Sequence, residues 1–480
     1  MDSDIINWLH LPDIMWESIL LNLEFICLLN ASETCKRFND LLSMSQRLMK
    51  KVRLEIGPYK DLKLIKECLL KSERKYDSII IRALVNNSAE NDIIDVIVDI
   101  LKHFAGSVKQ ITFLKTSLQD DNFFKIIQIL KNLKVLKFKG RDCGLDHSKN
   151  TEVVRPDIIS SINEISIEEV GKFSFQKLDL FDNLITLDVN DYMSTVDETF
   201  DNFLLRQKNL KVLHLRDLYH AFLFKTDKLT KNIKFSLDEL TLDEVYWTDN
   251  ENAMKFFTTQ TNIKKVTINL QNLYFNRLDG EMCYNELLIH FFGNNLQLNT
   301  VNLSTYGYII KDFSFLEGIV NPSVENLDFR LDSSQNATEL LAAFTKLFPN
   351  VKNFSYLVRT EDSHGLDQIH KWKLLESINC NLRDINQFFE NVNLVENLTN
   401  CTITCIYGDC IRKNRLMNFL NHHQNIKHMT INPHICAIEL DEIIFLIVNA
   451  LKSLETLTYK GKKMSLLNNS KIKTNYLIDF

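Results

Sequence analysis

A single pattern of apolar and polar positions repeats from residue 76 almost to the end of the chain. Apolar residues fill the first, fourth and sixth places of a six-residue unit, as in residues 133–138, which read Leu-Lys-Val-Leu-Lys-Phe. Fifteen such units begin between Tyr76 and Leu454, with a mean spacing of 27 residues. Because side chains alternate between the two faces of a strand, each unit predicts a short strand with one buried and one wet face.

Between these units the spacing of apolar residues is helical. Residues 121–130, 338–348 and 441–451 place apolar side chains on one side of a helix. Strands and helices that alternate with a period of about 20–29 residues are typical of leucine-rich repeats. We therefore expect an α/β leucine-rich-repeat solenoid of about 15 repeats, with parallel strands inside and helices outside. A doubly wound α/β domain is the alternative, and it needs strands that are apolar almost throughout.

The N-terminal residues 11–42 precede the repeats and do not follow their pattern. Three groups of apolar residues have helical spacing there, and Pro12 suits the first turn of a helix. Helices this short cannot bury their apolar surface among themselves, so part of it is expected to meet a partner or the first repeats. We expect four segments: an all-α three-helix domain in residues 1–50, a connecting helical segment in 51–75, the solenoid in 76–462 and a tail in 463–480.

Composition and charge narrow the possible functions. The 480 residues include only 12 Gly and 6 Pro, and neither the G-x-G-x-x-G nor the G-x-x-x-x-G-K-[ST] motif occurs. The net charge of −6 gives no overall attraction to nucleic acid or to an anionic membrane. The N-terminus is acidic where a secretory signal is basic, and the longest apolar run, Ile443–Val448, is too short to cross a bilayer. We therefore expect a protein of the cytoplasm, the nucleus or both, rather than a secreted or receptor ectodomain.

The order of residues in the segment 11–48 resembles that of an F-box. The positions that carry the resemblance are Leu11-Pro12-Asp13, Ile19-Leu20, Leu23, Leu28-Leu29 and Cys35-Lys36-Arg37-Phe38. Ile14 stands where an acidic residue is common in the family, and no Trp follows the third helical group. With the repeats behind it, this segment is similar in plan to the F-box and leucine-rich-repeat subunits of SCF-type cullin-RING ubiquitin ligases.

This resemblance implies a role without bond chemistry and without a cofactor. The F-box would bind the adaptor, and through it the cullin and RING subunits, while the repeats would hold an unknown protein substrate near the ubiquitin-charged enzyme. The residues expected on the adaptor-binding surface, some of which must also hold the helices together, are Leu11, Pro12, Met15, Ile19, Leu20, Leu23, Leu28 and Phe38. The alternative is a leucine-rich-repeat interaction scaffold or inhibitor without ubiquitin transfer, in which residues 11–42 are only a cap.

Two features predict a substrate-binding face on the repeats. Aromatic residues just past successive strands should stack along one rim, where Tyr and Trp are frequent in binding hot spots; alternatively they fill the loops between repeats. Acidic residues in the middle of the solenoid would steer basic substrate segments, or they form an ordinary solvated face. The candidate substrate-binding residues are Tyr192, Tyr219, Tyr246, Trp247, Tyr274, Tyr306, Tyr308, Asp188 and Asp243.

A zinc site is the one metal site that the sequence raises. The residues concerned are Cys401, Cys405, Cys410, His422, His423 and His428. The cysteines lack the usual C-x2-C spacing, and Cys401 fills an apolar place of a repeat, so we expect no metal. The carboxylates form no recognisable acid/base pair either, so no catalytic residues are expected.

Overall fold

The computed structural model describes residues 11–57, 61–82, 90–140, 144–146, 161–170, 178, 181–190, 198–223, 232–247, 249–269, 280–305, 314–331, 337–358, 365–382, 384–392, 395–405, 411–433 and 440–465. The chain divides into two compact units. The first comprises the residues up to Leu210 and two short later pieces, Asp217–Leu223 and Asn232–Phe235. The second comprises the remaining residues.

The first unit begins with four helices. They are α1 (Asp13–Leu21), α2 (Phe25–Thr34), α3 (Lys36–Met44) and the short α4 (Gln46–Met49). Their core is small, because only five of their apolar side chains with described exposure are fully buried: Leu20, Leu28, Leu42, Leu48 and Met49. Pro12 directly precedes α1, where its fixed φ suits a helix start. The expected helical domain is therefore present at the N-terminus, with the short α4 as a fourth helix beyond the three that were expected.

Strands and helices then alternate through the first unit. The main elements are β1 (Arg53–Ile56), α5 (Leu62–Leu70), β2 (Ser78–Arg82), α6 (Glu90–Phe104), β3 (Gln110–Leu114), α7 (Asp120–Ile129), β5 (Val135–Lys139), β7 (Glu164–Glu168), β8 (Thr186–Asn190) and α8 (Glu198–Arg206). The six strands of this series pair in chain order and run parallel. A separate parallel pair consists of β4 (Ser117–Gln119) and β6 (Gly144–Asp146). Strand β9 (Val212–Leu223) contains residues of both units.

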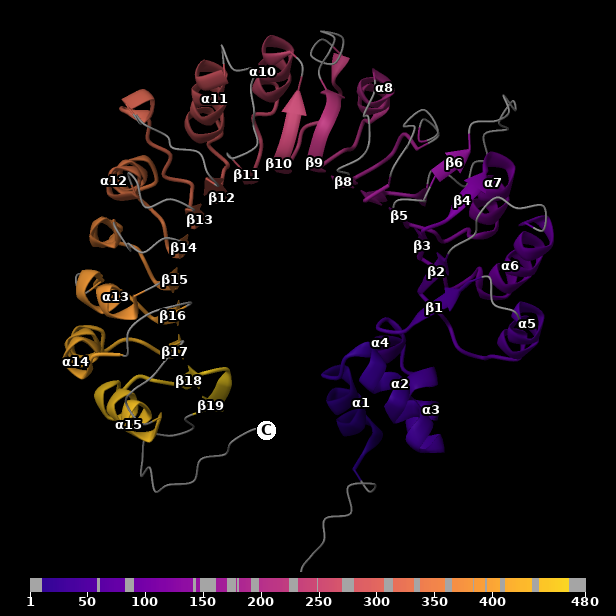
Figure 1. Ribbon diagram of the computed structural model, residues 1–480, viewed down its shortest axis with the longest axis horizontal. Coiled ribbons are helices and arrows are strands. Elements are labelled where there is room, and N and C mark those ends of the chain that lie inside the picture. The colour runs from indigo at the N-terminus through magenta and orange to yellow at the C-terminus, as the bar shows by residue number, and fades with distance from the viewer. Residues whose placement is uncertain are drawn as a thin grey trace, which may run out of the picture. The chain divides into compact units, whose positions relative to one another are not determined.

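The second unit continues the same alternation. Its strands are β10 (Glu239–Trp247), β11 (Lys265–Asn269), β12 (Thr300–Thr305), β13 (Asn326–Leu331), β14 (Asn353–Val358), β15 (Ser377–Leu382), β16 (Asn400–Cys405), β17 (His428–Asn432), β18 (Thr456–Tyr459) and β19 (Lys462–Ser465). Its α-helices are α10 (Asn250–Thr258), α11 (Gly280–Ile289), α12 (Ala337–Leu347), α13 (Ile385–Asn391), α14 (Lys413–His422) and α15 (Leu440–Ala450). A π-helix, η4 (His290–Asn294), and two 3-10 helices, η5 (Ser314–Leu316) and η6 (Leu366–Lys371), complete the series. Strands β10 to β18 are parallel, and β19 pairs antiparallel with β18. Within this unit the strands form an inner layer and the helices an outer layer (Figure 1).

The strand register stacks equivalent places of successive repeats. Val301 pairs with Leu327, Leu327 with Phe354 and Phe354 with Ile378. All four side chains are buried, and the residues on either side of them in each strand are mostly half-exposed. Burying one apolar row against the helices is what a single repeat cannot do alone. The predicted solenoid, with parallel strands inside and helices outside, is therefore confirmed.

The sheet begins earlier than the repeat pattern predicts. Residues 51–75, expected as a connecting helical segment, contribute strand β1 as well as helix α5. The β1–β2 register aligns Lys51 with Tyr76, so a lysine stands at the first place of this repeat, where the pattern has an apolar residue. For this reason the apolar pattern does not predict the repeat that contains β1. The Lys51 ammonium donates instead to the main-chain oxygens of Leu21 and Leu23 at the end of α1. A cation there complements the negative end of the helix dipole.

A buried polar side chain precedes several repeats, three places before their first apolar residue. Gln207, Gln260, Asn295, Asn321 and His423 hold this place, and each is at most 2% exposed. Each bonds to main-chain atoms of the preceding repeat, at 2.7–3.2 Å. Because buried main-chain groups need partners, these side chains join neighbouring repeats in addition to the apolar rows.

Candidate functional site

Arg37 ties the start of α1 to α3. Its Nε and Nη2 donate to Asp13 Oδ1 at 3.0 and 2.5 Å, and Nη2 also donates to the main-chain oxygen of Leu11 at 2.6 Å. Beside this contact the rings of Trp16 and Phe38 pack edge to face, with their centroids 4.7 Å apart. The basic and aromatic residues that carry the sequence resemblance in α3 therefore position α1.

The eight residues predicted for adaptor binding divide between the surface and the helix core. Met15 and Ile19 are 49% and 40% exposed and lie one turn apart on α1. Pro12 is exposed and three others are partly exposed, namely Leu11, Leu23 and Phe38. Leu20 and Leu28 are only 3% and 1% exposed. These two are therefore among the residues that hold the helices together, and an adaptor-binding role for any of the eight stays a prediction.

Three further exposed apolar side chains were not predicted from the sequence. Ile14, Ile26 and Met44 are 71%, 68% and 82% exposed. Ile14 adjoins Met15, so α1 presents an apolar strip of Ile14, Met15 and Ile19, which we name the α1 strip. The signal available in the sequence was the apolar residue at position 14, where an acidic one is common in the family. Large exposed apolar groups gathered on one helix are typical of an interaction surface.

Residues 8–50 match the F-box domain family. The chain therefore combines an F-box domain with a leucine-rich-repeat solenoid. Among solved structures, an internalin (InlF) of Listeria monocytogenes is similar at 11% identity, covering 78% of this chain and 95% of its own, with a TM-score of 0.37. A leucine-rich-repeat protein of Leptospira interrogans is similar at 12% identity, covering 74% of this chain and 91% of its own, with a TM-score of 0.32. No curated protein matches the chain.

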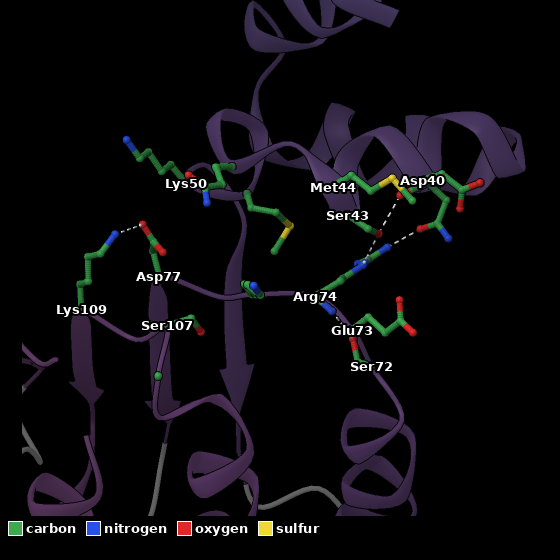
Figure 2. A pocket seen from close by; sticks show the side chains of 15 residues that line it. Asp40, Ser43, Met44, Lys50, Ser72, Glu73, Arg74, Asp77, Ser107 and Lys109 are labelled. Atoms are coloured by element: carbon green, nitrogen blue, oxygen red, sulfur yellow. Dashed lines mark hydrogen bonds and ion pairs between the residues drawn. The ribbon is translucent and has the colours of Figure 1, made fainter. Parts of the chain in front are cut away.

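Arg74 links the F-box to the first repeats. It follows α5, and its Nε donates to Ser43 Oγ of α3 at 3.1 Å, while its Nη2 donates to Asn39 Oδ1. Figure 2 shows Arg74 reaching toward Ser43 across a cavity of about 700 Å³ that both parts line. An ion pair between Asp77 and Lys109, 3.0 Å apart, lies in the same lining. Side chains of both charges line the cavity.

Most of the candidate substrate-binding aromatics cannot be placed. Tyr192, Tyr274, Tyr306 and Tyr308 lie outside the described residues. Tyr219 belongs to β9, and Tyr246 and Trp247 belong to β10, but their side chains also lie outside the described part. The predicted aromatic rim therefore stays a prediction.

The two candidate acidic residues are described. Asp188 is half-buried on β8, and Asp243 on β10 accepts a hydrogen bond from Asn269 Nδ2 at 2.7 Å. Nearby on β10, Glu239 accepts from Lys265 Nζ at 2.6 Å and lies 3.2 Å from His214 Nε2. Partial burial opposes ionisation of Glu239, but the bond and charge of Lys265, with His214, lower the pKa of this carboxyl overall. These carboxylates are engaged by neighbours, so steering of basic segments by them stays a prediction.

The residues considered for zinc have other roles where they are described. Cys401 and Cys405 are buried on β16, and burial raises the pKa of the Cys401 thiol, which opposes the thiolate form that binds metal. His423 donates to the main-chain oxygen of Val392 at 3.1 Å. Cys410 lies outside the described residues. Among the residues that the structure describes, no group of three or more His, Cys, Asp or Glu could hold a metal, and no helix could span a membrane.

Proposed function

We propose that this chain is the substrate-recognition subunit of an SCF-type ubiquitin ligase that works in the cytoplasm or nucleus. The F-box match at residues 8–50 carries the proposal. The F-box binds the ligase adaptor, which brings the cullin and RING subunits, and the solenoid binds a protein substrate. The chain forms and breaks no bond itself. It raises the local concentration of a substrate lysine near the ubiquitin-charged enzyme, which is a positional effect.

The α1 strip is the proposed centre of the adaptor contact. Ile14, Met15 and Ile19 are exposed, and Pro12 at the start of α1 is exposed as well. Leaving three large apolar side chains in water costs free energy that a bound partner would recover. Arg37 supports this contact by holding the start of α1 on α3. Leu11, Leu23 and Phe38, which are partly exposed, lie at its margin.

The test is reconstitution of the complex from purified parts. The full chain is mixed with the adaptor, the cullin and the RING subunit, and complex formation is followed by size-exclusion chromatography. We expect a stable complex. A chain that stays alone on the column would overturn the proposal.

Ubiquitin transfer distinguishes the proposal from the scaffold alternative. Proteins that the chain captures after proteasome inhibition are offered to the reconstituted ligase, and we expect at least one to be ubiquitinated. A complex that forms with the adaptor but modifies none of its captured proteins would favour the interaction scaffold.

A further inference from the structure

In the second unit, the places of strands β12 to β18 whose side chains point away from the helices carry almost no charge. The register aligns three rows on this side of the sheet. The first row is Thr300, Asn326, Asn353, Ser377, Asn400, His428 and Thr456. The second row is Asn302, Asp328, Ser355, Asn379, Thr402, Thr430 and Thr458. The third row is Ser304, Arg330, Leu357, Asn381, Thr404 and Asn432. We name these rows the neutral face, which lies on the inner side of this unit (Figure 1).

The two formally charged residues of the neutral face compensate each other. Asp328 and Arg330 are neighbours on the same side of β13, and Arg330 Nη2 lies 3.3 Å from Asp328 Oδ2. His428 Nε2 lies 3.9 Å from Glu455 Oε2. Within these rows a charged ligand therefore meets no uncompensated counter-charge, and at the edge of the face Lys463 of β19 lies beside Thr458 in the register.

The corresponding side of the first unit is different. Its strands carry ion pairs that connect neighbouring repeats: Glu55 with Arg82 at 2.8 Å, Lys137 with Glu164 at 3.7 Å and Lys139 with Glu168 at 2.6 Å. The absence of charge from the neutral face is therefore not required by the repeat architecture.

The amides and hydroxyls of the neutral face keep hydrogen-bonding capacity. Asn353 Nδ2 donates to Asn326 Oδ1 at 2.8 Å, and Asn302 Nδ2 donates to Thr267 Oγ1 at 3.0 Å. Each Asn amide carries two donor hydrogens and an acceptor oxygen, so one bond each leaves further hydrogen-bonding groups on Asn353 and Asn302, whereas the amide of Asn326 is fully engaged. Asn353 and Asn379 are exposed. The neutral face can therefore both donate to and accept from a partner.

Three properties select the class of partner. A charged side chain buried on this face would lose its hydration without gaining a counter-charge. Apart from His428 the rows hold no aromatic ring on which a base or sugar could stack. Neighbouring strands lie about 4.8 Å apart and same-side residues about 7 Å apart, which is a grid that an extended polypeptide can follow.

We propose that the neutral face binds an extended, uncharged substrate segment rich in Ser, Thr, Asn or Gln, and that phosphorylation of the segment prevents binding. A phosphate brings up to two negative charges to a face whose one arginine, Arg330, already pairs with Asp328. The inference rests on the proposed function only in calling the partner a substrate.

The test uses the full chain without adaptor and a set of fluorescent synthetic peptides. Neutral peptides of about 12 residues, built from Ser, Thr, Asn, Gln and Gly, are compared with versions in which about four residues are phosphoserine, Glu or Lys. We expect fluorescence anisotropy to show binding of neutral members and at least about tenfold weaker binding of their phosphorylated versions. Raising the salt from about 50 to 500 mM should change the affinity of the neutral peptides by less than about twofold.

A matched pair of variants locates the binding. Asn379→Lys places an unpaired cation at an exposed position of the neutral face. It should lower the affinity for neutral peptides about tenfold and raise the affinity for phosphorylated peptides. Gln110→Lys makes the same change on strand β3 of the first unit and should leave both affinities unchanged. Circular dichroism checks that both variants fold. The salt series uses the unaltered chain, so it tests the proposal even if a variant fails to fold.

Several outcomes would overturn the inference. These are no binding of any neutral peptide, tighter binding of phosphorylated peptides, a steep salt dependence, or equal loss in Asn379→Lys and Gln110→Lys. Adaptor binding is measured separately from peptide binding. If the chain binds neutral peptides but does not bind the adaptor, the ligase proposal is overturned, while the proposal for the neutral face remains supported.

Discussion

The F-box and the repeats hold themselves together in different ways. The repeats bury stacked apolar rows and add buried polar contacts between neighbours, as Gln260 does with the main-chain amide of Leu237 at 2.9 Å. The F-box has a small core and leaves Ile14 and Met44 71% and 82% exposed, while Arg37 fastens its first helix. The difference teaches that apolar residues stabilise the solenoid itself but, in the F-box, remain partly available to a partner. Changes in the two regions should therefore have separable effects.

The largest effect is expected from a core residue of the repeats. Trp372 is 1% exposed, packs on Phe354 with ring centroids 4.9 Å apart, and donates to the main-chain oxygen of Phe348 at 2.8 Å. Trp372→Ala should lower the free energy of unfolding by about 3–5 kcal/mol, measured by urea denaturation. Trp372→Phe, which keeps most of the volume, should cost less. Adaptor affinity should not change, and a parallel loss of it would break the separation between the two regions.

The next effect is a pH dependence that the repeats should show. Burial lowers the pKa of His423 to about 4, below its value of about 6.5 in an unfolded chain. The unfolded chain thus takes up the proton first, so stability is full above about pH 6.5 and falls as the pH drops toward 4, by about 3 kcal/mol.

The control for this pH effect comes from the repeats themselves. Gln207 and Gln260 occupy the equivalent place in other repeats. His423→Gln should therefore keep a main-chain bond and flatten the pH dependence of urea denaturation, leaving a smaller slope from His290, whose pKa burial also lowers. An unchanged slope in His423→Gln would refute the assignment.

A smaller effect is expected from the polar contact inside the F-box. Arg37→Ala removes the bonds to Asp13 and to the main-chain oxygen of Leu11, and should destabilise the F-box by about 1–2 kcal/mol because Arg37 is partly exposed. Hydrogen exchange of the α1 amides should quicken and adaptor affinity should fall. The exposed neighbour offers a control, since Lys36→Ala should do neither.

The smallest effect is expected from a surface ion pair between repeats. Lys139 and Glu168 lie 2.6 Å apart on β5 and β7 and both are over a third exposed. Lys139→Met should cost less than about 1 kcal/mol, and raising the salt concentration should shrink the difference from the wild type in urea denaturation. A cost as large as that of Arg37→Ala would contradict the view that apolar rows, rather than surface charges, hold the repeats together.

The solenoid strands were predictable because each carries its own period. Leu184, Leu187 and Val189 occupy the first, fourth and sixth places of one unit, and all three are fully buried. The first repeat escaped because Lys51 replaces the apolar first residue and bonds to α1 instead. The buried polar position before several repeats was also not predicted, because in the sequence Gln260 resembles any loop residue. Its role becomes visible only when the preceding repeat is stacked beside it.

The F-box itself was predictable from its residue order, but its surface was not. Leu20 and Ile19 are adjacent and equally apolar in sequence, yet one is 3% and the other 40% exposed. The hydrophobicity of a side chain indicates that it avoids water, but it does not indicate whether the side chain is buried in the protein's own core or covered by a partner. The helix arrangement decides this, through contacts such as those of Arg37 that join residues 24–26 positions apart.

The most direct measurement is the adaptor affinity of a double variant of the α1 strip. Met15→Ala with Ile19→Ala removes two exposed side chains, and Phe445→Ala removes one that is 65% exposed on α15. We expect the double variant to weaken adaptor binding at least about tenfold, by isothermal titration calorimetry, with unfolding unchanged, and Phe445→Ala to bind as the wild type does. Equal adaptor affinity in all three proteins would contradict an adaptor-binding role for the exposed face of the F-box.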